Sequence, residues 1–169
     1  LGPAAIRVAL HSGSGNHSSE ASVEVVDQLD DVGDVAIVNE RGSHADADAI
    51  TAAVAAQLDN GRQIITLGGD HSITFPILRA FRAQHDNLTV VHIDAHPDLY
   101  DDLDGNPLSH ASPFARALEA GCMTNHVRYV KLIIATDVVY DGSEAVTGAD
   151  LLLPNLGLYL KVMVGVIAI

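Results

Sequence analysis

The chain has 169 residues, of which 48% are apolar and 18% charged, so it is long enough for one domain with a sizeable core, and its composition excludes a disordered or fibrous protein. Its formal net charge of −13 leaves no basic surface to neutralise phosphates, so we expect no nucleic-acid partner. The single cysteine, Cys122, excludes an internal disulfide, and no secretory signal pattern is visible, which favours the cytoplasm or the mitochondrial matrix over secretion.

The first third of the chain is predicted to form a helix, a strand and a second helix. Arg7 to Leu10 closes a short helix, and His11 to Ser19 has the composition of a loop. Val35 to Val38 is an apolar run suited to a buried strand. Asp46 to Leu58 is predicted to be a helix, because apolar residues recur four apart on one face at Ile50, Val54 and Leu58.

The middle of the chain repeats the order of strand and helix. Gln63 to Leu67 is predicted to be a strand, and Gly68-Gly69 a tight turn. Ser72 is the expected N-cap of a helix that runs to about Gln84. The buried face of that helix should contain Ile73, Ile77 and Phe81. Leu88 to Ile93 follows as the next predicted strand.

A further helix and two further strands are predicted after residue 110. Ser112-Pro113 opens a helix that Gly121 can close. Val127 to Ala135 and Lys161 to Ile169 are strand candidates. The apolar stretch from Leu151 to Ile169 is interrupted by polar and helix-breaking residues, so we interpret it as a buried strand with its approach and not as a membrane anchor.

Strands that alternate with helices of about a dozen residues indicate parallel pairing with helices on both faces of the sheet. The predicted fold class is therefore α/β, a three-layer α/β/α sandwich with a mainly parallel sheet. No segment has the composition of a linker, so a single domain is expected.

A cluster of potential metal ligands follows the strand that ends at Ile93. The period of two along extended chain sends Asp94, His96 and Asp98 to one side. Ligands bind beyond the carboxyl ends of strands in an open parallel sheet. Carboxylates and an imidazole without a thiolate favour a hard or borderline divalent ion, with Mn²⁺ preferred and Zn²⁺, Co²⁺ and Ni²⁺ left open.

Three more histidines lie close to this cluster in the predicted fold or in the sequence. His71, in a Gly-Gly-Asp-His-Ser turn at the end of the preceding strand, could reach the same metal site. His110 precedes the helix that Ser112 caps, and could serve as an acid or proton shuttle. His92 shares the parity of Asp94 but lies within the strand, which favours a core or supporting role over ligation.

Three sequence blocks together resemble the ureohydrolase family of arginases and agmatinases. They are Gly68-Gly69-Asp70-His71-Ser72, Asp94-Ala95-His96-Pro97-Asp98 and Ser109-His110-Ala111-Ser112. The opening residues and the segment Asp31 to Val35 are also similar, so the resemblance covers about residues 1–121. Residues 98–101 and 110–116 look most like the branch of plant-type arginases and bacterial agmatinases.

The resemblance implies an arginase-like fold and a manganese pair. His71 and Asp98 would bind one manganese, His96 the other, and Asp94 would bridge both. A hydroxide between the two ions would attack the carbon of a guanidinium group, and His110 would protonate the leaving amine. The implied reactions are agmatine to putrescine and urea, or arginine to ornithine and urea, in a homo-oligomer.

Residues 122–169 depart from the family pattern and are predicted to be a divergent C-terminal segment of the same domain. The family's Asp-x-Asp-x-x-Asp-Pro motif and its later substrate-binding glutamate are not found there. Fewer than two manganese ions are therefore expected, and the alternative is a truncated, catalytically inactive metal-binding subunit that associates with full-length relatives. No Asn stands two residues after Asp98 to receive an amino-acid carboxylate, which slightly favours agmatine.

Overall fold

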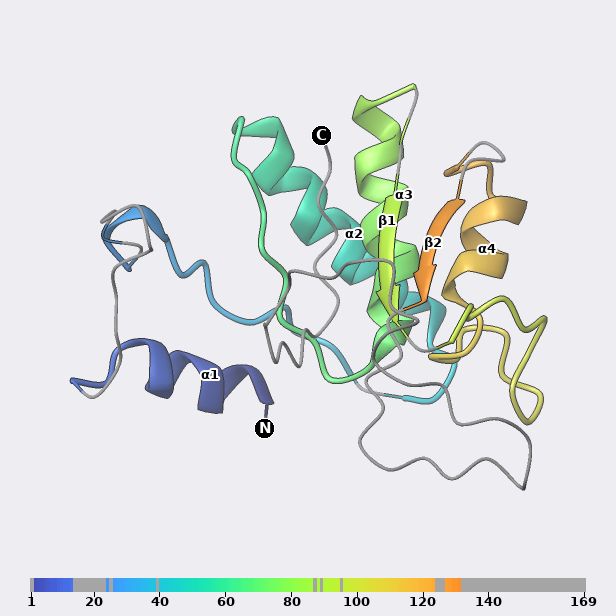
Figure 1. Ribbon diagram of the computed structural model, residues 1–169, viewed down its shortest axis with the longest axis horizontal. Coiled ribbons are helices and arrows are strands. Elements are labelled where there is room, and N and C mark those ends of the chain that lie inside the picture. The colour runs from blue at the N-terminus through green and yellow to red at the C-terminus, as the bar shows by residue number, and fades with distance from the viewer. Residues whose placement is uncertain are drawn as a thin grey trace, which may run out of the picture.

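The computed structural model describes residues 2–13, 24, 26–38, 40–86, 88, 90–94, 96–123 and 127–131, the last of these by their backbone. Figure 1 shows helices α2, α3 and α4 gathered beside a small sheet, with α1 standing apart from them. The predicted strand at Lys161–Ile169, the apolar stretch from Leu151 and most of the divergent segment lie outside the described residues.

The N-terminal helix α1 spans Gly2–Leu10, which confirms the predicted short helix and extends it back to Gly2. Its contact with the segment that follows is ionic. The Arg7 guanidinium lies 2.8 Å from a carboxylate oxygen of Asp31 and 2.6 Å from one of Asp34. A single 3₁₀ turn, η1 at Val26–Gln28, precedes these two aspartates.

Helix α2 spans His44–Asp59 and buries the predicted face of Ile50 and Val54. Ser43 is its N-cap, and the hydroxyl accepts a hydrogen bond from the backbone N–H of Asp46. The Asp46 carboxylate in turn accepts from the backbone N–H of Val38 at 2.7 Å. Because that N–H is bonded to a helix start, it is not available to a strand ladder.

Two predicted strands are not formed. Residues 35–38 have no strand conformation, and Val35, Ile37 and Val38 are exposed, so the prediction of a buried strand there is wrong. Residues 63–67 are also irregular, although Ile64 packs against the core while Ile65 is 74% exposed. These two side chains still alternate between the core and solvent. No neighbouring strand among the described residues accepts or donates the backbone hydrogen bonds that would make this segment a strand.

The turn before the third helix is capped differently from the prediction. A 3₁₀ turn, η2 at His71–Ile73, leads into α3 at Thr74–Gln84. Asp70 and not Ser72 is the cap, because the Asp70 carboxylate accepts from both the backbone N–H and the hydroxyl of Ser72. At Gly68 a Cβ atom would collide with Cδ1 of Ile73, so a larger residue there would require the Ile73 side chain to move.

The sheet of the described residues has two parallel strands, β1 at Val90–Asp94 and β2 at Val127–Lys131, paired from Val90 with Val127 to Asp94 with Lys131. Helix α4, at Pro113–Glu119, forms the crossover between them and begins with proline as predicted. Residues from α2, α3, β1 and α4 share one core, which includes Ile50, Val54, Ile77, Leu78, Phe81, Leu88, Val90 and Phe114.

One face of β1 carries this core. Val90 and His92 point into it, whereas Val91 and Ile93 on the other face are each 37% exposed. The parallel pairing agrees with the predicted α/β class, and α2, α3 and α4 pack on this one face, so the third layer of the sandwich stays a prediction. None of the described helices combines the length and the apolar character that a membrane span requires.

Candidate metal centre

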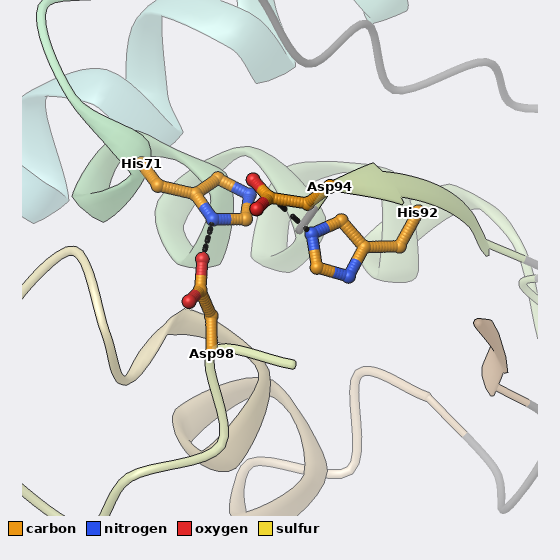
Figure 2. Close-up of side chains that lie close together, drawn as sticks. All are labelled: His71, His92, Asp94 and Asp98. Atoms are coloured by element: carbon orange, nitrogen blue, oxygen red, sulfur yellow. Dashed lines mark hydrogen bonds and ion pairs between the residues drawn. The ribbon is translucent and has the colours of Figure 1, made fainter. Parts of the chain in front are cut away.

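Four side chains that can bind a metal meet at the carboxyl end of β1. They are His71, His92, Asp94 and Asp98, and one ligand atom of each lies within 4.8 Å of those of the other three. Figure 2 shows that they approach from different elements: His71 from the start of η2, His92 and Asp94 from β1, and Asp98 from the following loop. The predicted convergence of the two strand-end motifs is therefore observed for His71, Asp94 and Asp98.

His71 is bonded on one side and unsatisfied on the other. Nδ1 donates a hydrogen bond to Oδ2 of Asp98, and the side chains of both residues are largely buried. The second ring nitrogen, Nε2, is buried and has no hydrogen-bond partner among the described residues. Figure 2 shows this edge of the ring turned towards the Asp94 carboxylate. A buried imidazole nitrogen without a partner is costly unless a ligand completes it.

Asp98 is held by its backbone as well as by His71. Its φ of 48° is in the left-handed region, which aspartate tolerates better than most residues. Its carbonyl oxygen accepts from the backbone N–H of Phe114 in the first turn of α4. A second hydrogen bond, of 3.0 Å from the backbone N–H of Tyr100 to the carbonyl oxygen of Ala111, holds the loop against the residues that precede α4. The start of α4 thus places this carboxylate.

The two oxygens of Asp94 face different histidines. Oδ2 lies 3.7 Å from Nε2 of His92, and Oδ1 lies 3.4 Å from Nδ1 of His96. Oδ1 also accepts from the backbone N–H of His96 at 2.9 Å. The side chain of His96 is 78% exposed and is not one of the four clustered residues. Asp94 therefore has the buried side chains of the cluster on one side and the exposed imidazole of His96 on the other.

His92 is the member of the cluster that the sequence favoured as a core or supporting residue. Its side chain is fully buried, and its ring stacks on that of His71 at 5.1 Å and lies 4.4 Å from that of Phe114. Burial lowers the pKa of His92, with a smaller contribution from His71, while Asp94 and Asp98 oppose the shift. The sequence signal was its parity with Asp94 on the inward face of the strand.

His110 lies outside the cluster. It is exposed, and it lines an open hollow of about 430 Å³ together with Asp70, Ser72 and Asp104. Its neighbour Ser109 is buried and hydrogen bonded to Ser112 at 2.9 Å. His110 is thus anchored beside the residues that cap η2, and the described contacts do not bring it to Asp94.

The donor set suits a divalent cation. Imidazole and carboxylate groups, with no thiolate among them, match Mn²⁺ and also suit Zn²⁺, Co²⁺ and Ni²⁺. Positive charge would satisfy both the buried Nε2 of His71 and the two carboxylates. The residues present therefore fit a bound metal ion.

Comparison with known proteins agrees with this geometry. The model of a family described as the arginase family matches residues 1–136. The mitochondrial arginase 1 of Oryza sativa subsp. indica is 39% identical over 127 residues, which are 70% of this chain and 37% of that protein. The N(1)-aminopropylagmatine ureohydrolase of Thermus thermophilus is 46% identical over 61 residues, 36% of this chain and 21% of that protein.

A solved structure is similar over the same region. The arginase from Medicago truncatula superposes with a TM-score of 0.58 and 31% identity, covering 73% of this chain and 41% of that one. The chain spans less than half the length of each of these relatives.

Proposed function

The chain belongs to the arginase family, and from this premise we propose that it carries the metal centre of a manganese-dependent hydrolase of guanidino compounds. The observation that supports the proposal is the cluster itself, in which three of the four predicted ligands, His71, Asp94 and Asp98, lie together. The buried Nε2 of His71 has no hydrogen-bond partner there among the described residues. A divalent cation bound there would lower the pKa of a bound water and allow attack on a guanidinium carbon near neutral pH.

The proposed roles are those that the resemblance to the family implies. His71 and Asp98 would hold one cation, His96 would hold a second, and Asp94 would serve both. The position of Asp94, with one oxygen near the buried His92 and the other near the exposed His96, is compatible with these roles. The departing nitrogen needs a proton to leave as a neutral amine, and we assign this proton to His110, as the resemblance to the family implies.

The proposed substrates are agmatine and arginine, with urea and a primary amine as products. Tyr100 occupies the position two residues after Asp98, where an asparagine could receive an amino-acid carboxylate, so agmatine is favoured slightly. The Oryza relative is named a mitochondrial arginase. We propose the mitochondrial matrix or the cytoplasm as the compartment and a homo-oligomer as the assembly.

The test is urea release by the purified chain, measured with agmatine and with arginine, after loading with Mn²⁺ and after removal of metal. Release that depends on Mn²⁺ would support the proposal, and the preferred substrate would identify the branch. The matched variant Asp94→Asn keeps the shape of the side chain but loses its charge, and it should release urea at least 100-fold more slowly. Manganese binding without any urea release would favour the inactive subunit instead.

A further inference from the structure

The imidazole of His92 occupies a place where an apolar side chain would be expected. It shares the inward face of β1 with Val90, and its side chain has no exposed surface. Moving a polar ring out of water costs free energy that an apolar residue of similar size would not incur. A histidine at this position, next to three candidate metal ligands, therefore indicates a role besides packing.

The contacts of the ring connect it to two of those ligands. On one side it stacks on His71 with 29° between the ring planes, and Phe114 meets both rings, at 4.4 Å from His92 and 5.4 Å from His71. Neighbouring rings on two sides of His71 fix the plane of its imidazole. The bond from Nδ1 to Asp98 then sets which way the nitrogens point within that plane.

The second contact is polar. Nε2 of His92 lies 3.7 Å from Oδ2 of Asp94, on the buried side of that carboxylate. The exposed side of the same carboxylate faces His96. A group behind a metal-binding carboxylate commonly orients it and raises metal affinity, and its removal commonly costs about 10-fold to 100-fold in affinity.

We propose that His92 is a positioning residue of the metal centre, which fixes the ring of His71 by stacking and the carboxylate of Asp94 from its buried side. The inference rests on the proposed function, because it requires that the cluster binds a cation. It adds a residue to the centre beyond the His71, Asp94, His96 and Asp98 set.

The experiment is a titration of the full chain with Mn²⁺ by calorimetry, together with pulsed electron paramagnetic resonance of the bound ion. His92→Phe keeps an aromatic ring and removes both nitrogens, and it should weaken Mn²⁺ binding by about 10-fold to 100-fold. Substitution of His92 by glutamine or asparagine tests whether a polar atom is needed at the position of Nε2. His92→Gln can place its amide nitrogen near the position of Nε2 and should recover part of the affinity, whereas the shorter His92→Asn should not.

The control is Val90→Ala, which removes volume from the same face of β1 without touching the four clustered residues, and it should leave Mn²⁺ affinity within about threefold. The resonance measurement should show the same number of imidazole nitrogens coupled to Mn²⁺ in wild type and in each His92 variant. A lost nitrogen would make His92 a ligand and overturn the positioning role.

If His92→Phe binds Mn²⁺ as tightly as wild type, or if Val90→Ala loses as much Mn²⁺ affinity as His92→Phe, His92 serves only in packing. Should His92→Phe not fold, equal affinities of the Gln and Asn variants would have the same meaning. Absence of Mn²⁺ binding by wild type would overturn the proposed function itself, and is distinct from every outcome that concerns His92 alone.

Discussion

The ring of His71 is hydrogen bonded through Nδ1 to the carboxylate of Asp98, 27 positions later in the chain. One partner starts a 3₁₀ turn and the other sits in a loop fastened to the start of α4. The bond therefore joins the two sequence motifs that were predicted to share a metal. It also leaves the second nitrogen of His71 on the side of the Asp94 carboxylate, so these three side chains converge within the described residues.

Two substitutions of Asp98 distinguish the effect of its charge from the effect of its backbone conformation. Asp98→Asn tolerates the left-handed φ of 48° and should fold normally, yet its Mn²⁺ affinity should fall at least 10-fold because the anionic donor is lost. Asp98→Ala should show the same loss of affinity and, in addition, a lower free energy of unfolding by about 1 kcal/mol. Calorimetric titration and urea denaturation measure the two effects. Equal affinity in wild type and Asp98→Asn would remove Asp98 from the centre.

Cation binding should stabilise the folded chain, because His71, Asp94 and Asp98 are close together only in the folded state. At a free Mn²⁺ concentration of about 100 times Kd, the free energy of unfolding should rise by about 2.7 kcal/mol. Chelation should reverse the gain, and His71→Phe should abolish most of it. The surface variant Asp48→Asn is the control, since Asp48 pairs with Arg79 away from the cluster. Identical denaturation midpoints with and without Mn²⁺ would contradict metal binding.

His110 should separate catalysis from metal binding. Because it lies outside the clustered donors, His110→Ala should keep Mn²⁺ affinity within about twofold of wild type. If it donates the proton to the leaving amine, the same variant should lose kcat by about 100-fold or more. Titration calorimetry and urea release are the measurements. A large loss of affinity would instead make His110 part of the metal site.

Cys122 should react slowly and should make stability depend on alkaline pH. Burial raises the pKa of the Cys122 thiol, and the nearby Arg79 and Arg82 offset part of that effect. The folded state thus favours the protonated thiol. This contribution is complete below the unfolded pKa of about 8.5 and is lost as pH rises from there through the raised folded pKa.

The measurement for Cys122 is the free energy of unfolding between about pH 7 and 10, compared with Cys122→Ala. Wild type should lose more stability than the variant over this range, and alkylation of native protein at about pH 8 should be much slower than that of unfolded protein. Parallel pH profiles and rapid alkylation of the native state would show that the thiol is accessible.

Leu78 should dominate the stability of the helical core. It lies in α3 with no exposed surface, in contact with the cluster of apolar residues from α2, β1 and α4. Leu78→Ala should lower the free energy of unfolding by about 2 to 5 kcal/mol, since it removes buried methyl groups and leaves a cavity. The exposed Val8 offers a control, because Val8→Ala should change stability by less than about 0.5 kcal/mol. Urea denaturation distinguishes the two.

Local sequence predicted the helices and the identity of most of the site. The four-residue spacing of Ile50 and Val54 identified α2, and Pro113 identified the start of α4, because a helix satisfies its hydrogen bonds within one segment. The aspartate block predicted that Asp94, His96 and Asp98 would point to one side, and this holds for Asp94 and Asp98 but not for His96, which is exposed outside the cluster. Extended geometry is not the reason, because β1 ends at Asp94 and Asp98 has a left-handed φ of 48°.

Tertiary structure alone decided the features that depend on distant partners. Residues 35–38 and 63–67 have strand-like sequences, but a strand also needs a neighbour for its backbone, and Val38 gives its N–H to Asp46 instead. The sequence marked His92 and His96 as neighbours of Asp94 without showing that His92 would be buried against Phe114 and His96 exposed. Burial depends on which helices pack over a strand, and that is a property of the assembled core.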